Sequence, residues 1–321
     1  MKKIIFLLAI AVFINSNLRS QELSNNLEKV GEMYAEKYLE PFTSVIGASF
    51  NSNLIGGKMH SVMKLPFDAF LYVGIKASGT TINDEDRSFD LLFTDSVDIG
   101  GVHKLAYYEV QNAPTILGST ETPTANGYYY DNQGNKIPVP PVQTIPGILD
   151  TKFYPFIIPQ IGIGSFYGAD LTLRFIPRIS LGNYGAMGYS GVILRYNVSY
   201  LFPKLPFNLA VQGGFQNISI ENDDGLKYMG GDSYMANLQV SKDIFLFNIY
   251  GGLQYEYFNS DISYFYIDKF NNEIPVTFSQ QSDMKFRGVV GASFNIFPVS
   301  INLDVSIGKR VVFGAGIGAL L

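Results

Sequence analysis

Apolar and polar residues alternate with a period of two along several long segments of this chain. In residues 245–257, every second residue from Phe245 onward is apolar or glycine, whereas the residues between them include Asn248, Gln254 and Glu256. The same alternation recurs in four further segments, at residues 192–202, 207–216, 284–296 and 301–307. Because successive side chains of a β-strand point to opposite faces, each segment predicts a strand with one apolar and one polar face.

The length of these segments favours a membrane barrel over a soluble sheet. The longest span 13 or 14 residues, whereas strands of soluble proteins average about 5 or 6 and a tilted membrane strand needs about 9–11. After residue 20, no apolar stretch reaches the roughly 20 residues of a transmembrane helix. Only a closed sheet satisfies every backbone hydrogen bond in lipid. The pattern therefore predicts an all-β protein, a transmembrane antiparallel up-and-down β-barrel.

The composition agrees with a surface that is hidden in lipid. Charged residues make up 16% of the chain, well below the roughly 25% of soluble domains, and the sequence contains 25 Phe, 21 Tyr and 32 Gly. We therefore expect outer-membrane lipid to surround the protein. The net charge of −5 and the lack of a basic run argue against nucleic acid as a partner.

Residues 1–20 have the order of a secretory signal peptide. Lys2 and Lys3 precede an unbroken apolar run at residues 4–14, and small and polar residues follow it. The run is too short for a transmembrane anchor. We therefore expect export, cleavage before Gln21 and a final location in the bacterial outer membrane.

Short and long connections alternate between the predicted strands. Outer-membrane barrels have short periplasmic turns and longer outer loops, which places both ends of the chain on the periplasmic side. The alternation predicts a barrel at residues 61–321 with about twelve strands, at residues 62–78, 88–98, 102–110, 154–165, 169–180, 189–202, 207–220, 233–241, 245–258, 284–297, 299–307 and 310–320. Ten to fourteen strands also fit, because the first three are poorly patterned. The proline-rich connection at residues 111–152 is expected as an external lid.

Residues 21–60 differ from the rest of the chain. Apolar residues recur at spacings of three and four between residues 22 and 43, which predicts an amphipathic helix that Pro41 ends. A linker rich in Gly, Ser and Asn follows at residues 47–57. The segment is a candidate plug of the barrel lumen. A helix that lies under the barrel mouth and closes nothing fits the pattern equally.

The polar faces of the predicted strands supply the candidate functional residues. Nine charged or amide side chains are expected to point into the lumen: Asp170, Arg174, Arg195, Gln212, Gln216, Glu256, Lys285, Arg287 and Asp304. Opposite charges in a narrow lumen pair with one another, which favours a filled interior and a structural role. The alternative is a polar path or binding site for a transported solute.

Signatures of catalysis and metal binding are missing from the sequence. It contains two histidines, His60 and His103, and no cysteine, so ligands for a metal cluster are scarce. No G-x-S-x-G, H-E-x-x-H or P-loop spacing occurs. The sequence therefore predicts neither an enzyme nor a resident cofactor.

Five short stretches resemble an outer-membrane β-barrel family of unknown function from Bacteroidetes-type bacteria. They lie at residues 38–42 (YLEPF), 47–52 (GASFNS), 168–177 (GADLTLRFIP), 189–192 (YSGV) and 205–210 (LPFNLA). The resemblance covers about residues 30–320 and implies an architecture more than an activity. A more distant similarity to FadL-type long-chain fatty-acid transporters implies an N-terminal segment held in the lumen.

Two functions fit these observations. The first is passive transport of a small hydrophobic molecule through a barrel gated by its N-terminal segment. The alternative is a non-transporting barrel that serves as a scaffold or as part of a secretion or gliding complex with other envelope proteins. A lumen with unpaired apolar pockets would favour the first function, and a lumen sealed by paired charges, with a conductance no higher than that of protein-free bilayer, would exclude it. Co-purification with stoichiometric partners from native membranes would favour the second.

Overall fold

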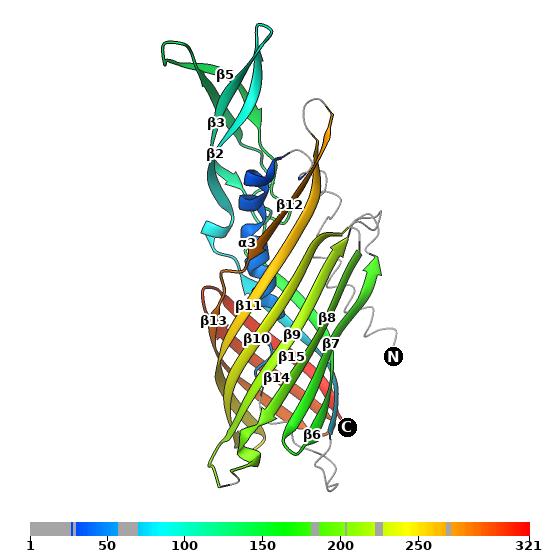
Figure 1. Ribbon diagram of the computed structural model, residues 1–321. Coiled ribbons are helices and arrows are strands. Elements are labelled where there is room, and N and C mark those ends of the chain that lie inside the picture. Colours follow the sequence, from blue (N-terminus) through cyan, green and yellow to red (C-terminus); the bar gives the residue numbers. More distant parts are fainter. Residues whose placement is uncertain are drawn as a thin grey trace.

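The computed structural model describes residue 27 and residues 30–56, 70–180, 186–202, 204–221, 227–267 and 271–321. The predicted signal peptide lies outside these residues, as does His60. Within them the chain forms a closed barrel, a separate four-stranded sheet beyond one end of it, and a helix that reaches into it (Figure 1).

Ten of the described strands close the barrel. Each is antiparallel to its neighbours in the order β10-β9-β8-β7-β6-β1-β15-β14-β13-β11, and β11 pairs with β10 to complete the ring. Their bounds are β1 (Phe70–Thr81), β6 (Phe153–Phe166), β7 (Ala169–Ser180), β8 (Ala186–Asn197), β9 (Asn208–Glu221), β10 (Lys227–Ile244), β11 (Phe247–Ile267), β13 (Phe286–Ile296), β14 (Val299–Ile307) and β15 (Val311–Leu320). The closed antiparallel ring confirms the fold class that the alternation predicted.

Two of the twelve predicted strands are not part of the barrel. β1 pairs directly with β6 along its whole length, which leaves residues 88–98 and 102–110 outside the ring. These residues form β2 (Ser88–Ile99) and β3 (Val102–Pro114), which pair with each other. The barrel therefore has ten strands, the lower end of the predicted range. A hairpin outside the membrane shows the same alternation as one that spans it, so the pattern alone did not separate them.

The four-stranded outer sheet replaces the expected lid. β3 also pairs with β4 (Thr124–Tyr130), and β4 pairs with β5 (Lys136–Gln143). β12 (Glu273–Gln281) forms a hairpin with the part of β11 that extends beyond the barrel. Figure 1 shows the sheet and this hairpin at the end of the molecule opposite the C-terminus. Two short 3-10 turns, η1 (Asp84–Asp86) and η2 (Val198–Tyr200), follow β1 and β8.

The outer surface of the barrel is apolar around its whole circumference. Leu253, Phe286 and Leu303 are each more than 60% exposed, and every barrel strand contributes similar outward side chains. About ten residues of β10 separate the aromatic Tyr234 from Ile244 at the short-turn end. At the usual strand tilt this distance corresponds to ~25 Å, the height of a membrane-spanning band.

Helix α3 (Glu32–Phe50) runs from the outer end of the molecule into the lumen (Figure 1). Near its start, the ring of Tyr34 packs edge-on against Phe89 of the outer sheet. Beyond its end, the amide of Gly56 donates to the side chain of Gln239, near the short-turn end of β10. The described chain therefore enters the barrel from the outer side, whereas we expected entry from the periplasmic side. No described helix is long and apolar enough to cross a membrane.

Pro41 lies inside α3 and does not end it, so the predicted boundary was wrong. Proline costs ~3 kcal/mol in a helix interior because it lacks a backbone N–H. Tertiary burial outweighs this cost. The buried apolar side chains of α3 include Leu39, Phe42, Val45, Ile46 and Phe50. At about 1.5–3 kcal/mol each, these five contribute roughly 7–15 kcal/mol.

One hydrophobic core joins the lumen to the outer sheet. Inside the barrel, the ring of Phe50 contacts those of Phe156, Tyr189 and Phe258 at centroid distances of 4.8, 5.1 and 5.7 Å. The same cluster continues along α3 to Tyr108 and other inward side chains of β3. The helix and the outer sheet therefore pack as one unit on the barrel.

Candidate functional site

The last turn of α3 is completed by the barrel wall. The final four carbonyls of a helix have no partner within the helix. In α3, Gly47 O and Ser49 O accept hydrogen bonds from the residues that immediately follow the helix. Ala48 O and Phe50 O accept instead from two arginines of the barrel. These arginine charges also face the negative end of the helix dipole.

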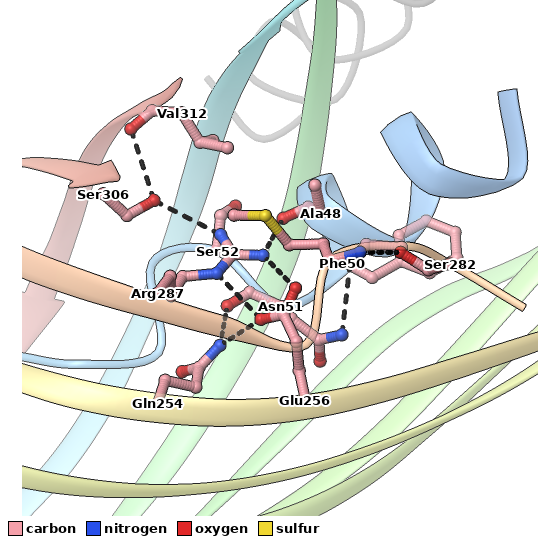
Figure 2. A network of polar contacts seen from close by, with 12 residues as sticks. Ala48, Phe50, Asn51, Ser52, Gln254, Glu256, Ser282, Arg287, Ser306 and Val312 are labelled. Atoms are coloured by element: carbon pink, nitrogen blue, oxygen red, sulfur yellow. Dashed lines mark hydrogen bonds and ion pairs between the residues drawn. The ribbon is translucent and has the colours of Figure 1, made fainter. Parts of the chain in front are cut away.

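Arg287, on β13, binds the first of these carbonyls. Its Nη2 donates to Ala48 O (2.8 Å), its Nε to Glu256 Oε2 (2.8 Å) and its Nη1 to Ser306 Oγ (3.3 Å). The side chains of Arg287 and Glu256 are 0% and 1% exposed, so the ion pair is sealed from solvent. Figure 2 shows the pair beside Ala48 and Asn51, where the helix meets the wall.

Arg174, on β7, binds the second carbonyl and the residues after it. Its Nη1 donates to Phe50 O (3.1 Å) and Ser52 O (3.2 Å), and its Nη2 donates to Asn53 O (2.9 Å). Its Nε donates to Gln160 Oε1 (3.3 Å). The side chain is almost fully buried. Its charge is therefore directed at the carbonyls that end α3.

Asn51, the residue that caps the helix, is held from three strands. Gln216 Nε2 on β9 and Ser233 Oγ on β10 donate to Asn51 Oδ1, at 2.8 and 2.9 Å. Gln254 Nε2 on β11 donates to Asn51 O (2.7 Å). With the two arginines, these contacts hold the helix end from five strands of the ring, β7, β9, β10, β11 and β13.

Further polar pairs line the lumen below the helix. Arg195 Nε donates to Asp170 Oδ2 (2.8 Å), and Tyr250 Oη donates to Asp304 Oδ2 (3.2 Å). Gln212 accepts a hydrogen bond from the side chain of a neighbouring asparagine at 2.8 Å. Eight of the nine residues expected in the lumen therefore lie on its wall, most of them in contact with one another or with the helix end.

Lys285 lies elsewhere. The prediction assumed unbroken alternation from residue 284, but β13 begins only at Phe286 and the residues before it are irregular. The Nζ of Lys285 lies 4.9 Å from the ring centre of Tyr257, a side chain in contact with the exposed Tyr234 on the outer face. The local break in the strand therefore turns Lys285 away from the lumen.

Lys76, on β1, is a lumen residue that the sequence reasoning missed. It is buried, and its Nζ donates to the side chain of Asn302 on β14. The signal was present, because Tyr72, Lys76 and Ser78 are buried at even positions of β1 whereas Leu71 and Val73 are exposed. It was overlooked because β1 was placed at residues 62–78 and judged poorly patterned.

A small polar cavity remains below the helix end. It has a volume of about 40 Å³ and is lined by residues that include Lys76, Asp170, Arg174, Arg195 and Gln212. This volume suits a few water molecules. It is far below the roughly 300 Å³ of a site for a drug-sized ligand.

A second set of ion pairs ties the outer loops to the helix. Arg310, in the connection between β14 and β15, donates from Nη2 to Asp86 Oδ1 (2.6 Å) and from Nη1 to Asp283. The backbone N–H of Asp283 donates to Ser44 Oγ of α3 (3.1 Å). Burial raises the pKa of Asp283, but hydrogen bonds from Arg310 and Lys309 outweigh burial and hold this pKa below its usual value.

No reaction chemistry is apparent in the part of the chain that the structure describes. No three His, Asp or Glu side chains gather there as metal ligands would. His103 lies at the start of β3, in the outer sheet. The charged groups of the lumen serve the helix end and one another.

An apolar belt around a closed strand ring, with polar side chains turned inward, defines an outer-membrane β-barrel protein. Within this class, the chain belongs to the family of unknown function DUF6588, whose model matches residues 1–320. No curated protein matches it in sequence.

Three solved outer-membrane proteins are among the structures to which this chain has a low similarity. The attachment invasion locus protein Ail of Yersinia pestis is 10% identical over 79% of this chain and 99% of its own, with a TM-score of 0.27. The translocator domain of the autotransporter NalP from Neisseria meningitidis is 9% identical over 90% and 96%, with a TM-score of 0.27. The toluene transporter TbuX of Ralstonia pickettii is 9% identical over 92% and 98%, with a TM-score of 0.22. These scores transfer no residue or ligand to this chain.

Proposed function

We propose that the protein is a closed outer-membrane anchor that presents its outer sheet to other envelope proteins and does not conduct solutes. The observation that carries this proposal is the docking of α3. Its last four carbonyls are all bonded, two of them to buried arginines of the barrel. Its apolar side chains form a common core with both the barrel and the outer sheet.

The energy of this docking supports a barrel that stays closed. The five aliphatic and phenyl side chains named above contribute roughly 7–15 kcal/mol by burial. The conformational entropy lost when the helix is ordered offsets part of this gain, and the buried hydrogen bonds from Arg174 and Arg287 add to it. We therefore expect α3 to stay in the lumen in the absence of a partner.

Planar-bilayer recording tests this proposal. Purified full-length protein inserted into a lipid bilayer is expected to give the conductance of protein-free bilayer across the physiological voltage range. A known porin inserted under the same conditions is the positive control. Steady channel openings of the wild-type protein would overturn the proposal.

Passive transport of a small hydrophobic molecule is the second candidate function. One observation favours it: the wall around the second half of α3 is apolar, with Tyr154 packed on Phe42 and with Phe156, Tyr189 and Phe258 packed on Phe50. A displaced helix would leave an apolar path in the outer half of the lumen. The polar middle of the lumen is the obstacle that such a molecule would have to pass.

Mass spectrometry of protein extracted gently from native membranes tests this second function. A hydrophobic molecule retained at a fixed ratio to the protein would support transport. A matched sample of the variant Phe258→Ala, which changes the apolar wall, should then retain less of it. Protein that carries only bulk membrane lipid in both samples would count against transport.

A further inference from the structure

The two edges of the outer sheet differ in whether they can accept another strand. The sheet ends in β5 on one side and in β2 on the other. β5 contains Pro138, Pro140 and Pro141, which lack the N–H needed for strand pairing, so this edge is blocked. β2 is twelve residues long and contains no proline, glycine or lysine. Its edge therefore lacks proline and lysine, and its aspartates are the charges that it presents against pairing.

The remaining strand edge outside the barrel is covered. β12 contains Pro275 and lies against α3, where Gln280 Nε2 donates to Glu36 O (2.5 Å). The barrel itself is closed and has no edge. Of the three outermost strands β2, β5 and β12, β2 is thus the one without a proline, and it packs on Tyr34 of α3 through one face only.

The inner face of β2 is only partly covered. Leu91, Phe93 and Val97 pack at the border of the core and are half-buried, and no residue of β2 is fully buried. On the neighbouring β3, Ala106 and Tyr108 are 0% and 4% exposed. A strand added beside β2 would place its own inward side chains against Leu91, Phe93 and Val97 and would bury them more fully.

The charge of β2 selects the kind of strand. β2 carries three aspartates and no basic residue, and Asp90 and Asp98 are exposed on the same face as Leu92. A second copy of β2 would bring further aspartates and no basic residue, so it would leave the charge of Asp90 uncompensated. A segment with basic residues outward and apolar residues inward matches both faces.

We propose that the edge of β2 from Ser88 to Thr94 binds an extended segment of another envelope protein by strand addition. In this segment, lysine or arginine alternates with apolar residues. Backbone hydrogen bonds to β2 supply affinity, and the alternating side chains supply specificity. The inference rests on the proposed function above, because it names the surface through which the anchored sheet meets its partner.

Binding of a synthetic peptide is the first test. The probe is a fluorescent nine-residue peptide of alternating lysine and valine, measured against full-length protein in lipid nanodiscs. The matched control peptide has the same sequence with every second backbone amide N-methylated, which keeps the charge and removes donors. The proposal expects binding at least about tenfold weaker for the control, the equivalent of one or two hydrogen bonds. Equal binding of both peptides, or binding of neither, would overturn it.

Disulfide trapping is the second test, and it reads out the strand geometry. The chain has no cysteine, so Thr94→Cys introduces a unique thiol on the edge strand. Peptides with one cysteine at successive positions should cross-link to it at every second position. Lys136→Cys, on the proline-blocked strand β5, is the matched control and should not cross-link. Equal cross-linking at all positions, or to both variants, would contradict strand addition.

The outcomes separate this inference from the proposed function. A disulfide-linked dimer of the Thr94→Cys variant without peptide would identify a second copy as the occupant and overturn the choice of partner. Failure of both peptide tests in a barrel that does not conduct would reject the edge site and leave the closed anchor standing. Channel openings would instead reject the closed anchor.

Discussion

Replacement of Arg287 by methionine should be one of the most destabilising single changes in the barrel. Its side chain is 0% exposed and its loss leaves the Glu256 carboxylate buried without a counter-charge, which costs about 3–5 kcal/mol. The change also removes the donor to Ala48 O, and an unsatisfied buried carbonyl costs about 1–3 kcal/mol. We therefore expect a loss of about 4 kcal/mol or more in the free energy of unfolding.

The assay is reversible urea unfolding of the protein folded into lipid vesicles. The double variant Arg287→Met with Glu256→Leu removes both charges, so only the helix contacts are lost and the cost should fall to about 1–3 kcal/mol. Lys285→Met, two residues away but outside the lumen, is the matched control and should change stability by less than about 0.5 kcal/mol. A double variant as unstable as the sum of the two single variants would refute the argument, because it would mean that the two charges do not interact.

Three further outcomes follow from the same contacts. As the pH falls, the stabilisation from the Asp283 carboxylate should be present above the usual aspartate pKa of about 3.9 and be lost as the pH passes through the lowered pKa. The protection of the η1 amides against exchange, corrected for the pH dependence of intrinsic exchange, should therefore be high at pH 5 and fall at lower pH. Protection that does not change with pH would contradict this. In urea unfolding, Gly316→Ala should lower the free energy of unfolding by about 1–3 kcal/mol, because the added Cβ would collide with Asn302. Gly213→Ala is the control and should be neutral, because the nearest atom to its added Cβ lies at 3.8 Å. Equal effects of the two substitutions would contradict this reasoning. Tyr34→Ala removes a ring that is 6% exposed and lies between the helix and the outer sheet, and it should destabilise this packing by about 3 kcal/mol. Amide exchange should then become faster in β2 and β3 than in the barrel strands. Exchange that becomes faster to the same extent in all strands would contradict a local effect.

The barrel was readable from the sequence because its signal is repeated in nearly every strand. The alternation at residues 245–257 places Ile249 and Leu253 on the outer face and Gln254 and Glu256 in the lumen, as the structure has them. In a closed sheet both faces are uniform in polarity over the full strand, so local pattern and global fold agree.

The structure of the outer sheet and of α3 was harder to predict from the sequence, because tertiary contacts determine these elements more than the local residue pattern does. β2 and β3 alternate like barrel strands, yet they pair outside the ring. Pro41 is a helix terminator by local preference, and the core on both sides of α3 overrides it. Lys285 was misplaced because a few irregular residues shift the alternation, and a short break of this kind leaves no mark on composition.

The sequence predicted that the charged lumen residues would be paired, but it did not predict their partners. The sequence indicated that charges such as Arg174 and Glu256 would be paired in a narrow interior. Their actual partners include backbone carbonyls of α3, and a backbone carbonyl carries no signature in the sequence. The hydrogen bonds from Arg174 and Arg287 to the end of α3 could therefore be found only in the structure.

The docking of α3 in the lumen is tested most directly by a disulfide between the helix and the wall. Ser49 Oγ lies 2.8 Å from Thr80 Oγ1 on β1, and both side chains are buried. The variant with Ser49→Cys and Thr80→Cys, in a chain without other cysteines, should form this bond spontaneously in the folded protein. The pair Ser49→Cys with Ser241→Cys, on the short-turn end of β10, should remain reduced. Two free thiols in the folded Ser49–Thr80 variant would contradict the account of a barrel closed by its own helix.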